Sequence, residues 1–178
     1  ELARLLLDQG ADVDVRNKSG EAPLHAAAET GHLEVAQLLL DHNADAQART
    51  VNGWAPLHIA AANGHLELAR LLLDQGADVD VRNKSDEAPL YAAAESGHLE
   101  VAQLLLDHNA DAQARTVNGW APLHIAAETG HLEVARLLLS KGASVDVRGK
   151  RSCTPLYIAA RVGHLEVVRL LLDGGADI

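Results

Sequence analysis

The sequence predicts an all-α repeat solenoid, in which stacked helix-turn-helix units are joined by β-hairpin loops. The first observation is a period of 33 residues that holds prolines, glycines and histidines in register: Pro23, Pro56, Pro89, Pro122 and Pro155; Gly31, Gly64, Gly97, Gly130 and Gly163; His32, His65, His98, His131 and His164. The second is the composition, which is 48% apolar but has no Phe, no Met, two Trp and two Tyr. A core of Leu, Ala and Val suits thin units that bury their faces by stacking on one another.

Residues 17–49 illustrate the expected unit. Pro23 is suited to the first turn of a helix because its missing N–H costs nothing there. We expect a short helix over 24–29, ended by Gly31, and a second helix over 32–42 with apolar residues at helical spacing. Asn43 follows, where the other units have Gly or Asn, the residues that best accept a left-handed conformation. The alternating stretch after it predicts an extended hairpin arm.

The recurring motifs identify the family that the chain resembles. They are "APLHAA", "APLHIA", "APLYAA", "APLHIA" and "TPLYIA", each followed by "GHLEV" or a near copy and then "LLL". These motifs resemble the ankyrin repeat in type, order and spacing over the whole chain. The resemblance implies a single domain over 1–178 with a partial repeat at 1–16, full repeats at 17–49, 50–82, 83–115 and 116–148, and an incomplete repeat at 149–178.

A second period of 66 residues overlies the first. Residues 1–66 and 67–132 differ only at the pairs Gly20/Asp86, His25/Tyr91, Thr30/Ser96, Ala62/Glu128 and Asn63/Thr129. This near-identity is compatible with a natural fragment of a longer array and with an engineered array. Because neither end has a polar capping repeat, self-association through the ends is also open, with Leu5, Leu6 and Leu7 exposed.

Two departures from the family pattern bear on stability. The family's Thr before Pro remains only at Thr154, and Ala22, Ala55, Ala88 and Ala121 replace it. Restoring Thr should add a cap to each short helix. In the hairpin turns, Asp86 and Ser152 stand where the other repeats have Gly20, Gly53 and Gly119, so we expect these two turns to be strained.

Composition excludes several classes of function. A formal net charge of −10 argues against nucleic acid and against an anionic membrane surface as partners. A single cysteine, Cys153, cannot form an internal disulfide and favours an intracellular, cytoplasmic location. No apolar run is long enough to span a bilayer.

Nothing in the sequence indicates an enzyme or a cofactor. The ten histidines recur by repeat register and show no convergent, closely spaced metal ligands, so we expect structural roles for them. No nucleophile elbow, Walker motif or dinucleotide fingerprint occurs.

The resemblance implies that a protein or peptide partner binds the hairpin tips and the concave face of the short helices. Ten candidate binding residues lie at matching positions: Arg16, Arg49, Arg82, Arg115 and Arg148 at the repeat ends, and Glu21, Trp54, Glu87, Trp120 and Cys153 two residues before each proline. The arginines suit carboxylates of the partner, or they pair with Asp14, Asp80 and Asp146 of the array itself. Trp54 and Trp120, about 20 Å apart, are anchors for the partner or covers for the next hairpin.

Three hypotheses follow. The first is a non-catalytic interaction module whose partner is extended or helical, with spaced apolar anchors and some acidic residues. The second is an architectural spacer or regulatory arm of a longer protein. The third, an enzyme, lacks a site.

Overall fold

The computed structural model describes residues 9–178, and this part of the chain folds into a row of helix pairs. The first helix of each pair has eight residues, and these helices are α2 (Pro23–Thr30), α4 (Pro56–Asn63), α6 (Pro89–Ser96), α8 (Pro122–Thr129) and α10 (Pro155–Val162). The second helix has nine residues, and these are α3 (Leu33–Asp41), α5 (Leu66–Asp74), α7 (Leu99–Asp107), α9 (Leu132–Ser140) and α11 (Leu165–Asp173). A 3₁₀ turn, η1 (Lys150–Ser152), lies in the last hairpin.

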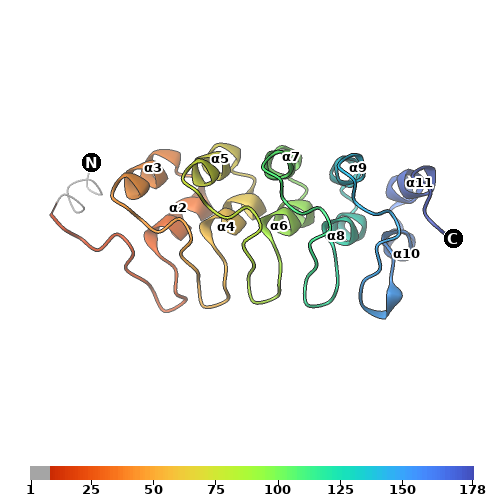
Figure 1. The fold of residues 1–178 in the computed structure, drawn as a ribbon, viewed down its shortest axis with the longest axis horizontal. Coiled ribbons are helices and arrows are strands. Elements are labelled where there is room, and N and C mark those ends of the chain that lie inside the picture. Colours follow the sequence, from red (N-terminus) through yellow and green to blue (C-terminus); the bar gives the residue numbers. More distant parts are fainter. Residues whose placement is uncertain (1–8) are drawn as a thin grey trace.

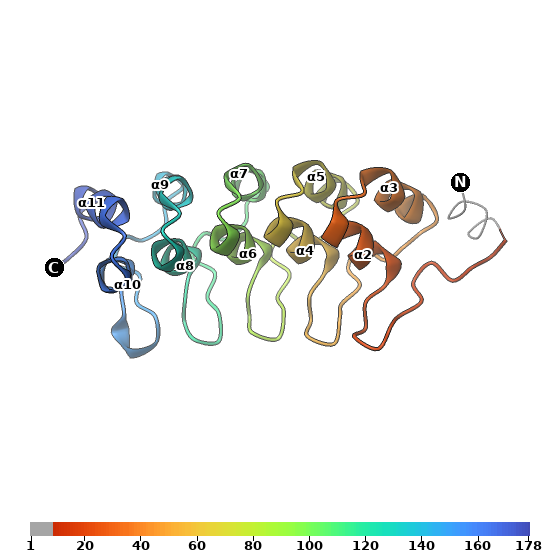
Figure 2. The same cartoon turned by 180° about the vertical axis from the view of Figure 1, so that it is seen from behind.

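The helices lie in two parallel rows, with all the hairpin arms projecting on one side (Figure 1). First helices pack on first helices along one row, second helices on second helices along the other, and each pair packs internally. Figure 2 shows the same rows from behind, with α2 and α11 at opposite ends of the described array. We call the surface formed by the first helices and the arms the inner face. This arrangement confirms the predicted all-α solenoid.

The helix boundaries follow from the residues expected to set them. Pro23 begins α2, preceded by Ala22 in an extended conformation, and Gly31 ends it in the left-handed region with φ of 73°. The second helix is one residue shorter at each end than expected, because His32 and His42 are its flanking caps and not helical residues. The same boundaries recur in each repeat because the same residues recur.

The core is continuous along the row and consists of small and medium side chains. Leu24, Leu57, Leu90 and Leu123 of the first helices are fully buried, as are Ala36, Ala69, Ala102 and Ala135 of the second helices. Alanine at these positions allows the two rows to approach closely. Each repeat thus buries its apolar faces against its neighbours, as the period predicts.

The hairpin arms are extended loops closed by tight turns. In the first arm the Asn17 N–H donates to the Glu21 carbonyl at 3.0 Å, and the Gly20 N–H donates to the Asn17 carbonyl at 2.9 Å. Neighbouring tips are joined by one backbone hydrogen bond, from Val51 N–H to the Ser19 carbonyl at 2.9 Å. One bond between tips is too few for a ladder, so no strand forms between residues 9 and 178.

The two turns expected to be strained have that strain in their backbone. Asp86 and Ser152 both have φ of 58°, in the left-handed region, whereas Gly20, Gly53 and Gly119 adopt 76°, 81° and 72°. A residue with a Cβ has an energetic penalty in this region that glycine avoids. Sequence comparison between repeats was sufficient to find both positions.

The leucines at the two ends of the array bear on the expected self-association. Leu5, Leu6 and Leu7, where exposed leucines were expected, lie outside the described residues. At the other end, Leu165 and Leu172 of α11 are 57% and 41% exposed.

Candidate functional site

The repeat-end arginines form a ladder of hydrogen bonds along the array. The Arg16 Nη1 donates to the Arg49 carbonyl at 2.6 Å, Arg49 to Arg82 at 2.6 Å, Arg82 to Arg115 at 3.2 Å, and Arg115 to Arg148 at 2.5 Å. Three of them also donate to a carbonyl of their own turn, namely that of Gly20, Asp86 or Gly119. The ladder therefore links each repeat to the next through backbone acceptors.

The expected pairing of these arginines with Asp14, Asp80 and Asp146 is wrong. Both carboxylate oxygens of Asp14 accept the Asp45 N–H, at 3.1 and 3.2 Å, and Asp80 and Asp146 accept the equivalent N–H groups of Asp111 and Asp177. None of the ion pairs between described residues includes a ladder arginine. The aspartates bind backbone amides of the next repeat because those amides lack another acceptor in the turn.

Three buried histidines form a second set of links between repeats. The Ala22 N–H donates to Nδ1 of His25, so Nε2 holds the hydrogen and donates to the Trp54 carbonyl at 3.1 Å. His58 and His124 make the same bonds, to the Glu87 and Cys153 carbonyls. Burial lowers the pKa of all three, that of His58 to about 4. These imidazoles are neutral at pH 7 and act as structural hydrogen-bond donors.

A second set of histidines seals the turns between paired helices and forms a third set of links between repeats. Nε2 of His65 lies 3.2 Å from the Glu29 carbonyl of the preceding repeat, and His98, His131 and His164 repeat the contact. A Cβ added at Gly31 would lie 2.6 Å from the His65 ring, so glycine is required there for space as well as for φ. Among residues 9–178 no group of three or more potential ligands is positioned to hold a metal ion.

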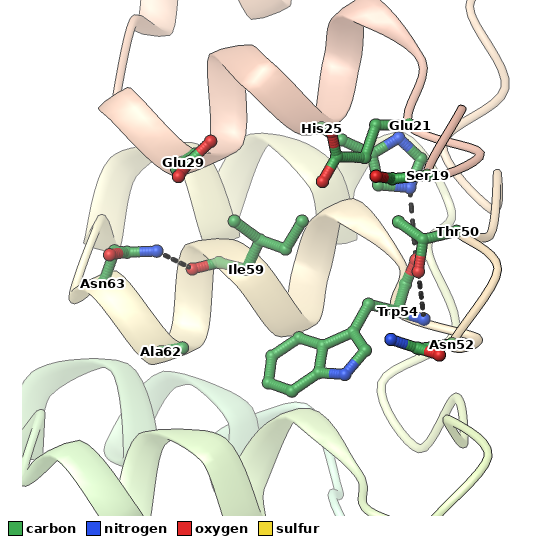
Figure 3. A pocket seen from close by; sticks show the side chains of 10 residues that line it. All are labelled: Ser19, Glu21, His25, Glu29, Thr50, Asn52, Trp54, Ile59, Ala62 and Asn63. Carbon is green, nitrogen blue, oxygen red and sulfur yellow. Dashed lines mark hydrogen bonds between the residues drawn. The ribbon is translucent and has the colours of Figure 1, made fainter. Parts of the chain in front are cut away.

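Trp54 lines a pocket on the inner face, between the first and second full repeats. The cavity has a volume of about 320 Å³ and is lined by Ser19, Glu21, His25, Glu29, Thr50, Asn52, Trp54, Ile59, Ala62 and Asn63. Figure 3 shows the carboxylates of Glu29 and Glu21 on one side of the Ile59 side chain and the indole of Trp54 on the other. The indole is half-buried, and its ring centroid lies 5.5 Å from that of His58.

Trp120 lines the equivalent pocket in the second 66-residue unit, and that pocket is smaller. Its volume is about 210 Å³, and its lining comprises Ser85, Glu87, Tyr91, Thr116, Val117, Asn118 and Trp120, without the α8 residues that correspond to Ile59 and Ala62. Tyr91 stands here in place of His25. Burial raises the pKa of the Tyr91 phenol, and the nearby carboxylates Glu95, Glu87 and Glu128 raise it further.

The indole of Trp120 also covers the next hairpin. A Cβ at Gly149 would lie 3.0 Å from its Cδ1, and its ring stacks on that of His124 with centroids 5.8 Å apart. The two interpretations of this tryptophan are therefore compatible, because one edge of the ring packs on the hairpin while the side chain still lines a pocket.

The ten candidate residues thus separate into two groups. Glu21, Trp54, Glu87 and Trp120 line the two inner-face pockets. The arginines form the ladder, and Cys153 is a free, half-buried cysteine whose carbonyl accepts from His124 and from the Gly149 N–H. Sequence reasoning missed Ile59 and Asn52 as pocket residues. Neither position holds the same residue in every repeat, so the repeat pattern did not mark them. A signal for Ile59 was present, because this helix position is Ala in two repeats and Ile in the other three.

None of the described helices combines the length and the hydropathy needed to cross a bilayer.

The comparisons with known proteins agree with the repeat geometry. The family model for ankyrin repeats (3 copies) matches residues 1–83, 76–149 and 115–178, which together cover the chain. A search of curated proteins gave no match. With its 33-residue helix pairs, its projecting arms and this match along its whole length, the chain belongs to the ankyrin-repeat family.

Proposed function

We propose that the chain is a non-catalytic protein–protein interaction module that binds a protein or peptide partner through its hairpin tips and inner face. Ankyrin repeats are in general modules of this kind. One observation supports the inner face in particular. All five differences between the two 66-residue units lie in the arms and first helices that form this face: Gly20/Asp86 in a hairpin turn, and His25/Tyr91, Thr30/Ser96, Ala62/Glu128 and Asn63/Thr129 on first helices.

The second helices make the contrast clear. α3 and α7 have the same sequence, although part of their surface is exposed, as Val35 is at 38%. If exposure alone permitted change, these helices would also differ between the units. Changes confined to one face fit a surface whose two halves contact different parts of a partner.

Within this face we propose Glu21, Trp54, Glu87 and Trp120 as the principal binding residues. They line pockets, and tryptophan in a half-buried pocket is a frequent hot spot of interfaces. Binding by Cys153 and by the five arginines stays a prediction. Four of the arginines, Arg16, Arg49, Arg82 and Arg115, already have acceptors within the array, which weakens our expectation of an acidic partner.

A peptide-display selection tests the proposal. The parent chain and the Trp54→Ala/Trp120→Ala variant are used as parallel targets, and a Glu34→Ala/Glu100→Ala variant, altered at exposed positions of α3 and α7, is the matched control. Peptides enriched on the parent and the control but lost on the tryptophan variant would support the proposal, provided that thermal melts agree for all three proteins.

The alternative is an architectural spacer or regulatory arm. It predicts no enrichment on any of the folded targets and a function that depends on the number of repeats and not on Trp54 or Trp120. The proposed partner is a protein or peptide, with neither nucleic acid nor a membrane as target, and the proposed location is the cytoplasm. Self-association through the array ends stays a prediction, which sedimentation over a range of concentrations would test.

A further inference from the structure

We propose that the Trp54 pocket accepts the cationic side chain of a lysine or arginine from the partner, and that the corresponding space beside Trp120 does not. This inference rests on the proposed function and adds the chemistry of the ligand.

The charge of the pocket favours a cation. Of its ten lining residues, Glu21 and Glu29 are acidic and none is Lys or Arg. His25, the remaining titratable group in the lining, is neutral because burial lowers its pKa and because both its ring nitrogens are engaged with backbone groups. The Glu21 Oε2 accepts from the neutral Asn17 amide at 2.6 Å, and no ion pair among the described residues involves either glutamate.

The remaining walls suit the rest of such a side chain. The indole of Trp54 offers a ring face, which attracts an ammonium or guanidinium group by a cation–π interaction. Ile59 and Ala62 supply apolar surface for the methylene stem, which long cationic side chains bury readily. A neutral apolar side chain would use Ile59 and Trp54 but would leave the two carboxylates unpaired, and an acidic one would be repelled by them.

The second unit supplies an internal comparison. Beside Trp120 the imidazole is replaced by the larger phenol of Tyr91, and Ala62 is replaced by Glu128, whose Oε1 pairs with Arg161 at 3.2 Å. The pocket there is about 210 Å³ instead of about 320 Å³ and does not extend to α8. Three of the five differences between the units, at His25, Ala62 and Asn63, therefore alter the walls of one pocket. Only the first unit retains the open form.

The two tryptophans allow a direct test by NMR, because the chain has just two indole N–H resonances. We would titrate the ¹⁵N-labelled chain with blocked tripeptides Gly-Lys-Gly, Gly-Arg-Gly and Gly-citrulline-Gly, in which citrulline is the neutral analogue of arginine. Assignment comes from a Trp120→Phe variant. We expect the lysine and arginine peptides to shift the Trp54 resonance and to leave that of Trp120 in place, and the citrulline peptide to shift neither.

Four variants locate the effect. Glu21→Gln/Glu29→Gln should weaken binding about tenfold, since two facing charges are removed. Glu34→Gln/Glu100→Gln removes the same charge from exposed second-helix positions and should change the affinity less than about twofold. His25→Tyr should close the pocket and abolish the shift. Tyr91→His/Glu128→Ala should open the second pocket and make the Trp120 resonance respond.

Equal shifts of both indoles, or equal losses in the two charge variants, would overturn the inference, because they would indicate attraction to the net negative charge alone. A response to citrulline equal to that of arginine would also overturn it. If display selection yields partners without Lys or Arg that still require Trp54, the interaction module stands and only the cationic ligand fails. If display yields nothing on any folded target, the proposed function itself fails.

Discussion

The guanidinium of Arg49 donates from Nη1 to the carbonyl oxygen of Arg82, 2.6 Å away in the next repeat. The acceptor is a backbone atom, so the bond survives any substitution at position 82. The guanidinium groups of the ladder thus donate to backbone carbonyls of the neighbouring repeat and not to its side chains.

Arg49→Ala should lower the free energy of unfolding by about 1 kcal/mol, because the Arg82 carbonyl loses a charged donor near the surface. Arg49→Lys should recover only part of this, since an ammonium lacks the planar fork. Urea melts followed by circular dichroism measure both. Because no carboxylate is involved, 0.5 M salt, about three times the physiological ionic strength, should leave the difference nearly unchanged. A difference that vanishes in salt would point to an ion pair instead.

Asp86→Gly should raise the free energy of unfolding by about 1 kcal/mol, because it removes a left-handed conformation at φ 58° from a residue with a Cβ. The converse change, Gly20→Asp, should destabilise by more, since a Cβ at Gly20 would lie 2.8 Å from the backbone nitrogen of Val51. Thermal melts of both variants check the pair. Equal stability of Asp86→Gly and the parent would mean that the Asp86 side chain compensates for its strain.

Ala→Thr at Ala22, Ala55, Ala88 and Ala121 should each raise stability by about 1 kcal/mol. Thr154 is the precedent within the chain, since its Oγ1 accepts the Tyr157 N–H at 3.2 Å. The alanines occupy the same N-cap position in nearly the same extended conformation and have no side-chain acceptor. Thr154→Ala is the matched loss. Urea melts without gain at any of the four sites would show that the buried alanine positions lack room for the larger side chain.

Acid should destabilise the fold through the buried histidines. The folded pKa of His58 is about 4 and its ordinary value is 6.5, so the unfolded chain binds more protons between these values. Its contribution is therefore complete above pH 6.5 and is lost as the pH falls toward 4, at up to about 1.4 kcal/mol per pH unit. His58→Tyr, which introduces the residue that the next repeat has at Tyr91, should flatten the dependence of stability on pH over this range, and Tyr91→His should steepen it. Parallel pH profiles for the parent and both variants would contradict the prediction.

The period alone was enough to predict the helices, their glycine ends and the strained turns at Asp86 and Ser152. These features depend on local backbone preferences, which single residues such as Pro23 and Gly31 reveal. The partners of the arginines were not predictable in the same way. Their acceptors are carbonyl oxygens, which every residue has, so the amino-acid sequence contains no mark of which one is used.

The difference between the two pockets was also missed, although its signal was present. The substitutions His25/Tyr91 and Ala62/Glu128 are visible in the aligned units. Their meaning depends on α2 and α4 bringing His25 and Ala62 to the same cavity across a repeat boundary, which is a fact of three-dimensional packing. A residue's position in the 33-residue period predicted whether it belongs to the inner face. It did not predict which inner-face residues line the same pocket.

The hydrogen bonds between repeats join residues 29 to 36 apart, so each reaches only the adjacent repeat. This short reach has a genetic consequence. If recombination joined residue 49 directly to residue 116, Arg49 would meet the Arg148 carbonyl just as Arg115 does now. Crossing-over between the two near-identical 66-residue stretches can therefore lengthen or shorten the array in one event and keep these contacts at the junction. The length of the proposed binding surface then becomes a quantity that a population can vary.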